Sequence, residues 1–231
     1  VTRVLVDILD HAHRGSRGRA LREEPRFNED EPGTFSLGSD GADLDSLELL
    51  TAAGLVSEFF HLGETSVDDL LLKKRRLRDW ADIVTHALGE GTSGVTFKTS
   101  GTTGTAAPRT HSWSSLQQEI EFLADVFADR SRIISMVPSH HIYGFLFAAL
   151  LPARLGVPVA ERRWDATGSA ARESRQGDLI ISQPEIWRYT TRVKRDWNPG
   201  VWGVSSTAPL GPQVHRSLRA ARLERLFEVY G

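Results

Sequence analysis

Four hydroxyl side chains and two glycines stand together at residues 99–104 and could bind an anion. The six residues are Thr99, Ser100, Gly101, Thr102, Thr103 and Gly104. Glycine allows the backbone to turn where a Cβ atom would clash, so amide N–H groups can point toward one anion, and the hydroxyls add further donors. A strand-like run at 95–97 precedes them, and we expect a helix to begin near 112–115, where its N-terminus favours negative charge. This pattern predicts a loop that binds the phosphates of a nucleotide.

Composition limits the partners that the chain can bind. Its 231 residues, 40% apolar and 25% charged, are enough for the cores of one large domain or two small ones. The 28 basic and 30 acidic residues give a net charge of −2, so no overall field indicates nucleic acid or a membrane surface as a partner. The absence of cysteine excludes disulfides, thiol catalysis and cysteine metal sites. No apolar run approaches the roughly 20 residues of a membrane span, so we expect a cytoplasmic protein.

The apolar pattern changes near residue 88. Apolar residues recur at helical spacing over 4–9, 46–60 and 77–88. A Gly- and Ser-rich linker follows, and beyond it the pattern alternates between strand and helix. We therefore expect a small helical bundle at residues 1–88 and an α/β domain at residues 89–231.

The second part contains several strand-like apolar runs. They lie at 95–97, 132–137, 157–160, 179–182, 201–205 and 226–230. Helical stretches such as 114–127 and 213–221 separate them. Because parallel sheets carry their ligand loops at the carboxyl ends of the strands, we expect 99–104, 138–144, 205–211 and Gly231 to share one rim.

Three further motifs follow the first loop in order. They are Pro-Ser-His-His-Ile-Tyr-Gly at 138–144, Ser-Ser-Thr-Ala-Pro-Leu-Gly at 205–211 and Val-Tyr-Gly at 229–231. In this order they resemble the His-containing loop, the adenine-side loop and the Tyr-Gly motif of the adenylate-forming (AMP-binding) superfamily. Residues 97–104 resemble the phosphate loop of the same superfamily. That superfamily includes acyl-CoA synthetases, coumarate-CoA ligases and peptide-synthetase adenylation domains. The resemblance implies an incomplete three-layer α/β AMP-binding domain.

The resemblance also implies a role for each matching residue. His141 would lie near the carboxylate and acyl pocket. The adenine ring would be lined through backbone contacts by Thr207, Ala208 and Pro209. Tyr230 would stack on that ring, and Gly231 would complete the motif.

The implied reaction joins a carboxylic acid, aryl or fatty, to a thiol. The phosphate loop would hold the β- and γ-phosphates of ATP while the carboxylate attacks the α-phosphate. The products of that step would be an acyl-adenylate and pyrophosphate, and the acyl group would then pass to the thiol.

Two departures from the family pattern affect these predictions. The family usually follows its loop with Pro-Lys-Gly, whereas residues 105–110 read Thr-Ala-Ala-Pro-Arg-Thr. Either Ala107 replaces the lysine, or Arg109 takes its place as a guanidinium that can bind phosphate. The family's Thr-Glu pair for phosphate and Mg²⁺, its ribose-binding Asp and its C-terminal domain with a catalytic Lys have no counterpart. Both ends of the chain look cut, and we expect the chain alone not to form an adenylate.

The helical part has a resemblance of its own. Residues 44–50, Leu-Asp-Ser-Leu-Glu-Leu-Leu, resemble the Asp-Ser-Leu motif of acyl and peptidyl carrier proteins. Ser46 would then carry a 4′-phosphopantetheine arm attached by a phosphopantetheinyl transferase. The alternative is that Asp45 and Ser46 cap the helix that follows them.

The His pair has two interpretations. His140 and His141 can belong to a structural turn or to the acyl pocket. Without acidic or further His neighbours at ligand spacing, we expect no metal site there.

Three functions remain open on this sequence. The adenylating part can load the carrier on its own chain, with a downstream synthase as a possible partner. It can instead use free CoA. A third alternative is a non-catalytic carrier or binding protein with a vestigial nucleotide loop. The cofactors implied are ATP, Mg²⁺ and 4′-phosphopantetheine or CoA.

Overall fold

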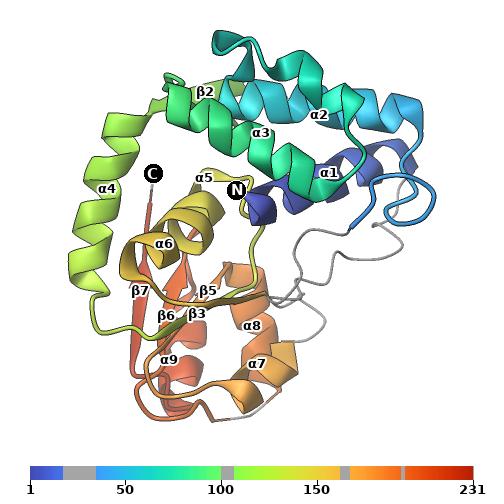
Figure 1. Cartoon of the computed structure of the whole chain (residues 1–231). Helices are drawn as coiled ribbons and strands as arrows, with labels where there is room; N and C mark the ends of the chain where they lie inside the picture. The colour runs from blue at the N-terminus through green and yellow to red at the C-terminus, as the bar shows by residue number, and fades with distance from the viewer. Residues whose placement is uncertain (18–34, 100–106, 162–166, 194–195, 231) are drawn as a thin grey trace. The chain divides into compact units, whose positions relative to one another are not determined.

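The computed structural model describes residues 1–17, 35–99, 107–161, 167–193 and 196–230 (Figure 1). The chain divides into two compact units, Val1–Gln117 and Gln118–Gly231. Each unit has its own set of buried apolar side chains.

The first unit begins with helices. They are α1 (Thr2–Arg17), α2 (Ser46–Phe60) and α3 (Leu77–Glu90), with the short 3₁₀ turns η1 (Leu62–Glu64) and η2 (Asp68–Lys73) before α3. Helix α1 packs on both α2 and α3. The helical spacing of apolar residues buries Leu9, Phe60 and Trp80 completely or nearly so. The indole Nε1 of Trp80 donates to the carbonyl oxygen of Leu71 at 2.9 Å, so this large ring is buried with its polar atom paired.

Helix α2 begins with a capping box. The Asp45 carboxylate accepts hydrogen bonds from the amides of Leu47 and Glu48, each at 2.9 Å, and the Glu48 carboxylate accepts from the Asp45 amide at 2.8 Å. Amides that the helix would leave unpaired are thereby satisfied. Ser46 is the first residue of the helix and is exposed. The capping alternative for Asp45 therefore describes an interaction that is present.

A β-hairpin completes the first unit. Strand β1 (Gly94–Thr99) pairs antiparallel with β2 (Ala107–Ser112). The ring of Phe97 lies 5.2 Å from that of Phe59, and β1 packs on α2. The first compact unit therefore includes this hairpin as well as the helices. The predicted domain boundary at residues 88–89 stays a prediction.

The hairpin corrects two predictions about the phosphate loop. We expected the loop to run from a strand of the parallel sheet directly into a helix. The helix α4 (Trp113–Val126) does begin close to residues 112–115, but β2 lies between it and the loop. Strand β1 belongs to a separate two-stranded sheet, so the loop does not end a strand of the parallel sheet. The pairing of β1 with β2 is the physical reason for both differences.

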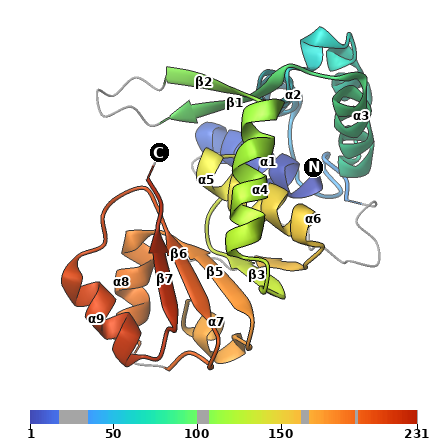
Figure 2. The same cartoon turned by 90° about the vertical axis from the view of Figure 1, so that its left-hand side faces the viewer.

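The second unit contains a five-stranded parallel sheet in the order β4-β3-β5-β6-β7. Figure 2 labels β3, β5, β6 and β7 of this sheet. Its strands are β3 (Arg132–Ser135), β4 (Val159–Glu161), β5 (Asp178–Ser182), β6 (Trp202–Ser205) and β7 (Arg225–Glu228). All neighbouring pairs in it are parallel. The sequence predicted a strand at each of these five places.

Helices cover both faces of this sheet. One face packs against α4 and the helical run formed by α5 (Ile142–Gly144), a π-helical turn (Phe145–Leu150) and α6 (Leu151–Leu155). The other face packs against α7 (Thr167–Glu173), α8 (Pro184–Arg192) and α9 (Pro212–Ala220). Successive residues alternate between the faces, so Leu179 and Ile181 join the first core and Ile180 joins the second. Burial on both sides explains why these strands are continuous apolar runs.

Two features fix the sheet internally. A Cβ atom on Gly203 would lie 3.0 Å from atoms of the Trp187 ring and of Leu226, so glycine allows α8 and β7 to approach β6. At the amino ends of β3 and β5, Arg132 donates to both carboxylate oxygens of the buried Asp178, at 2.9 and 2.6 Å. The carboxyl ends, at the opposite edge, carry the candidate site.

Candidate nucleotide site

The adenine-side loop and the Tyr-Gly segment leave neighbouring parallel strands. Ser205 ends β6, and Glu228 ends β7 beside it. The Val229 amide donates to the carbonyl oxygen of Ser205 at 2.9 Å, and the Ser206 hydroxyl donates to the carbonyl oxygen of Val229 at 2.9 Å. These bonds hold the first residues of the loop against the extension of β7.

The Glu228 carboxylate fixes the other end of this loop. It accepts hydrogen bonds from the Leu210 amide at 2.8 Å, from the Tyr230 hydroxyl at 2.8 Å and from Nε2 of His215 at 2.7 Å. The Leu210 amide, followed by the Tyr230 hydroxyl and His215, lowers the pKa of Glu228 below its usual value. The hydrogen bond to Glu228 raises the pKa of the Tyr230 hydroxyl.

The residues predicted to contact adenine lie between these two anchors. Thr207, Ala208 and Pro209 are exposed, and Tyr230 is 68% exposed. The backbone of Thr207 has φ of 80°, a left-handed conformation that is uncommon for a residue other than glycine. An exposed aromatic ring beside an exposed loop backbone is suited to a planar ligand that stacks on one and hydrogen-bonds to the other.

The His-containing loop follows β3 and crosses to the neighbouring strands. The buried Tyr143 hydroxyl contacts the carbonyl oxygens of Ser182 at 3.0 Å and Val204 at 2.9 Å, at the carboxyl ends of β5 and β6. Burial raises the pKa of Tyr143 well above its usual value. A Cβ atom on Gly144 would lie 1.9 Å from the carbonyl oxygen of Pro138, so only glycine fits the turn. His141 is exposed, with its ring 4.3 Å from that of His140.

Two serines mark the sheet edge beneath these loops. Ser182 and Ser205 are registered partners on β5 and β6, and both are fully or almost fully buried. Neither hydroxyl has a hydrogen-bond partner in the part of the chain that the structure describes. Unpaired buried hydroxyls are uncommon in proteins, and they mark a place where water or a polar ligand group would be stabilised. Neither serine was among the site residues that the sequence predicted.

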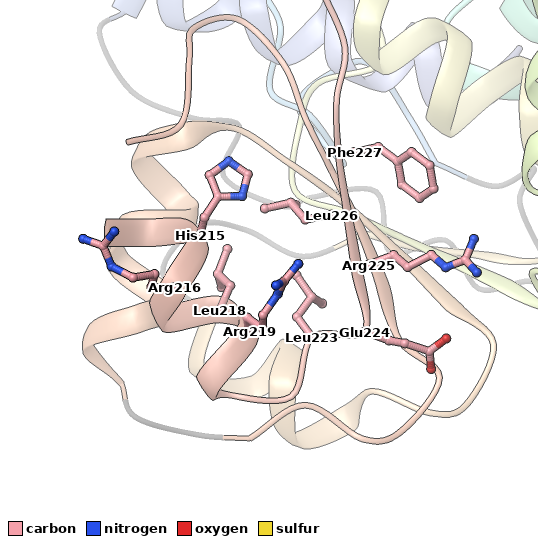
Figure 3. Close-up of a pocket in the computed structure, with 9 residues that line it drawn as sticks. All are labelled: His215, Arg216, Leu218, Arg219, Leu223, Glu224, Arg225, Leu226 and Phe227. Carbon is pink, nitrogen blue, oxygen red and sulfur yellow. The ribbon is translucent and has the colours of Figure 1, made fainter. Parts of the chain in front are cut away.

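A separate cavity of about 500 Å³ lies between α9 and β7 (Figure 3). Figure 3 shows Leu218 and Arg219 on the side of α9 that faces β7, whereas Arg216 points away. None of the residues that the sequence predicted as site residues lines it.

Several predicted site residues lie elsewhere in the chain. Ser100, Gly101, Thr102, Thr103, Gly104 and Gly231 fall outside the described residues. Thr99 is the last residue of β1, and the exposed Arg109 lies on β2 opposite Phe97. Ser46 begins α2. The structure therefore places the adenine-side loop beside the Tyr230 segment, and it attaches the His-containing loop to the ends of β5 and β6. The phosphate loop stays a prediction.

Among the described residues, no side chains gather as a preformed metal site. Nowhere among them do three His, Cys, Asp or Glu side chains gather as metal ligands. Glu228, a carboxylate at the candidate site, already accepts three hydrogen bonds.

The sequence is similar to bacterial proteins named 4-coumarate–CoA ligase. It is 41% identical over 214 residues to the 4-coumarate–CoA ligase of Halorhodospira halophila, a match that covers 93% of this chain and 54% of the relative. It is 35% identical over 245 aligned positions to the 4-coumarate–CoA ligase of Rhodobacter capsulatus, covering 100% of this chain and 61% of the relative. The chain is a homologue of these ligases. It spans little more than half of their length.

These relatives support the adenylate-forming superfamily that the motifs indicate. They do not show a carrier domain, because the similarity to the Rhodobacter protein extends over the helical residues as well. No family model matches the chain.

Solved structures support the fold. The chain resembles ATP-bound MatB from Rhodopseudomonas palustris with a TM-score of 0.52 and 15% identity, over 83% of this chain and 43% of that one. It resembles the AMP complex of o-succinylbenzoate–CoA synthetase (MenE) from Bacillus subtilis with a TM-score of 0.51 and 16% identity, over 64% and 34% of the two chains.

None of the described helices has the length and apolar character needed to cross a membrane.

Proposed function

We propose that this chain is the nucleotide-binding part of an ATP-dependent acid–thiol ligase. The observation that carries the proposal is the exposed arch of Thr207, Ala208 and Pro209, anchored at both ends beside the exposed ring of Tyr230. Homology to two CoA ligases over nearly the whole chain supports it.

The proposed chemistry has two steps. A carboxylate oxygen of the acid attacks the α-phosphorus of ATP, the bond to the β-phosphate oxygen breaks, and pyrophosphate leaves. The thiol sulfur then attacks the acyl carbon, the thiol proton is lost, and AMP leaves. Both steps require phosphate charge to be held still in a fixed geometry.

Each predicted residue has a place in this scheme. Tyr230 and the arch bind the adenine ring, and His141 lies near the reacting carboxylate. Thr99–Gly104 and Arg109 hold the β- and γ-phosphates. Gly231 keeps its proposed place in the Tyr-Gly motif.

The acid is proposed to be an aromatic one, such as 4-coumarate, because both relatives are named for that substrate. For the same reason free CoA is the preferred thiol. A fatty acid remains the alternative acid.

The carrier hypothesis keeps one supporting observation, which is the exposure of Ser46 at the start of α2. It has its own test. After incubation with CoA and a phosphopantetheinyl transferase, intact-mass spectrometry would show a phosphopantetheine adduct on the wild-type chain and none on Ser46→Ala. An unmodified wild-type chain contradicts the carrier hypothesis and leaves the CoA reaction in place.

Nucleotide binding tests the ligase proposal. Calorimetry should show that the double variant T102A/T103A binds ATP about tenfold more weakly than the wild-type chain and binds AMP equally well, because only ATP carries the β- and γ-phosphates. Thr191→Ala, which removes an exposed hydroxyl on α8, is the matched control and should bind both nucleotides normally. Equal loss of ATP and AMP affinity in T102A/T103A would contradict the assigned phosphate role. Failure of the wild-type chain to bind either nucleotide would favour the vestigial-loop alternative.

A further inference from the structure

The adenine-side arch is attached to β7 at both of its ends. On one side, Ser206 and Ser205 bond to the main chain of Val229. On the other, the Leu210 amide bonds to the Glu228 carboxylate at 2.8 Å. Leu210 itself is buried, whereas the three residues of the arch are exposed. The conformation of the arch therefore depends on two anchors, and one of them is a single side chain.

The same carboxylate holds the aromatic ring. Tyr230 is 68% exposed, so packing against the protein does little to fix its ring. Its hydroxyl donates to Glu228 at 2.8 Å. This bond restricts the orientation of an exposed ring before any ligand binds, which lowers the conformational entropy that binding must remove.

A third contact keeps the carboxylate in place. His215, near the start of α9, reaches the second oxygen of Glu228 through Nε2 at 2.7 Å. Figure 3 shows the His215 ring near the start of α9, on the side toward the strand β7. The Glu228 carboxylate thus accepts hydrogen bonds from Leu210, His215 and Tyr230. Because both of its oxygens are bonded, the carboxylate has little freedom to rotate.

We propose that Glu228 is a positioning residue that holds the adenine-side arch and the Tyr230 ring in the arrangement that accepts an adenine ring. The inference rests on the proposed function, because it concerns the same nucleotide site. Glu228 does not itself contact the ligand in this account. It acts through the Leu210 amide and the Tyr230 hydroxyl.

Binding of AMP by the full 231-residue chain tests the inference. Calorimetry should give an affinity at least tenfold weaker for Glu228→Ala than for wild type. Glu228→Gln keeps a carbonyl oxygen that can accept one of the bonds, so it should lose less, about threefold. Tyr230→Phe keeps the ring and removes only its hydroxyl, and it should also bind AMP several-fold more weakly.

Glu224→Gln is the matched control. Glu224 stands just before the other end of β7 and accepts a hydrogen bond from Nε1 of Trp202 at 3.2 Å. This variant makes the same chemical change as Glu228→Gln next to the other end of β7, away from the arch, and should bind AMP as the wild type does.

Amide hydrogen exchange provides a readout that a general loss of stability would not reproduce. The Leu210 amide should exchange faster in Glu228→Ala and at the wild-type rate in Glu224→Gln, while amides in the core strand β5 stay protected in both.

The outcomes separate the inference from the proposed function. If wild type binds AMP and Glu228→Ala, Glu228→Gln and Tyr230→Phe bind it equally well, the positioning role is overturned and the nucleotide site stands. Unchanged exchange at Leu210 in Glu228→Ala overturns it too. If the wild-type chain binds no AMP, the proposed function itself is contradicted. Should Glu228→Ala not fold, Glu228→Gln and Tyr230→Phe still decide the question.

Discussion

At the scale of single residues, the candidate site depends on polar groups that connect separate segments. Tyr143 connects the His-containing loop to the ends of β5 and β6. Glu228 connects the adenine-side loop, α9 and Tyr230. Tyr143 bonds to main-chain carbonyl oxygens, and Glu228 accepts a bond from the main-chain amide of Leu210. Each side chain can therefore position the loop that it contacts or belongs to.

Replacing Tyr143 by Phe should destabilise the protein. The change leaves the carbonyl oxygens of Ser182 and Val204 without this partner in a buried place, which costs about 1–3 kcal/mol. Urea unfolding of the wild type and the variant measures the difference. Equal stability of Tyr143→Phe and wild type would mean that the bonds contribute nothing.

The sequence alone could suggest the exposed residues of the site but not their anchors. Thr207, Ala208, Pro209 and Tyr230 stand within recognisable motifs. Glu228 and the serines at the strand ends have no such local signal, because their importance comes from neighbours that are far away in the sequence. In the sequence, the one indication of a role for Glu228 is its position two residues before Tyr230.

At the scale of elements, α2 and the hairpin show how local and long-range effects combine. The capping box starts α2 with residues close in sequence. The hairpin is held by pairing and by the contact of Phe97 with Phe59, which are 38 positions apart (97 − 59). An apolar run predicted β1, whereas Ala-Pro-Arg-Thr-His-Ser in β2 is mostly exposed and polar, so its strand conformation comes from its partner.

The capping box predicts different effects for two adjacent residues. Asp45→Ala removes the acceptor for two amides and should lower the free energy of unfolding by about 1 kcal/mol. Ser46→Ala, at an exposed position inside the first turn, should change it by less than about 0.5 kcal/mol. Chemical denaturation of both variants checks this. A larger loss for Ser46→Ala than for Asp45→Ala would contradict the capping account.

Glu64 should make the stability of the first unit depend on pH. Its carboxylate accepts from the Ser93 hydroxyl and amide, both at 2.6 Å, and lies 3.0 Å from His61. These contacts lower the pKa of Glu64 from 4.5 to about 2. Because the folded pKa lies below the unfolded one, the stabilisation is present above pH 4.5 and is lost as pH falls toward 2.

The difference in melting temperature between wild type and Glu64→Gln measures this effect. It should be constant above about pH 5 and shrink as the pH is lowered from there toward 2. Glu119→Gln, at an exposed position on α4, is the control. A difference that grows on acidification would contradict the assignment.

At the scale of the whole molecule, the sequence predicted the α/β character of the second part of the chain. Five strands between helices follow from apolar runs whose length and composition are typical of buried parallel strands. The composition change near residue 88 suggested a boundary there. The hairpin packs on α2 and belongs to the first compact unit, and no local pattern in the sequence reveals that contact.

The helical residues have a second interpretation beside the carrier hypothesis. The similarity to the Rhodobacter ligase includes these helices. The capping box then accounts for the Asp45-Ser46 pair as the start of a helix.

The central claim is that Tyr230 and the adjacent arch form an adenine site. Its most direct test is the dissociation constant of AMP for the wild-type chain and for Tyr230→Ala, with GMP as the comparison ligand. Stacking of a base on an aromatic ring contributes about 1–3 kcal/mol, so Tyr230→Ala should bind AMP roughly 5- to 150-fold more weakly. The wild-type chain should prefer AMP to GMP. Equal AMP affinity in wild type and Tyr230→Ala, or no AMP binding by the wild-type chain, would contradict the account.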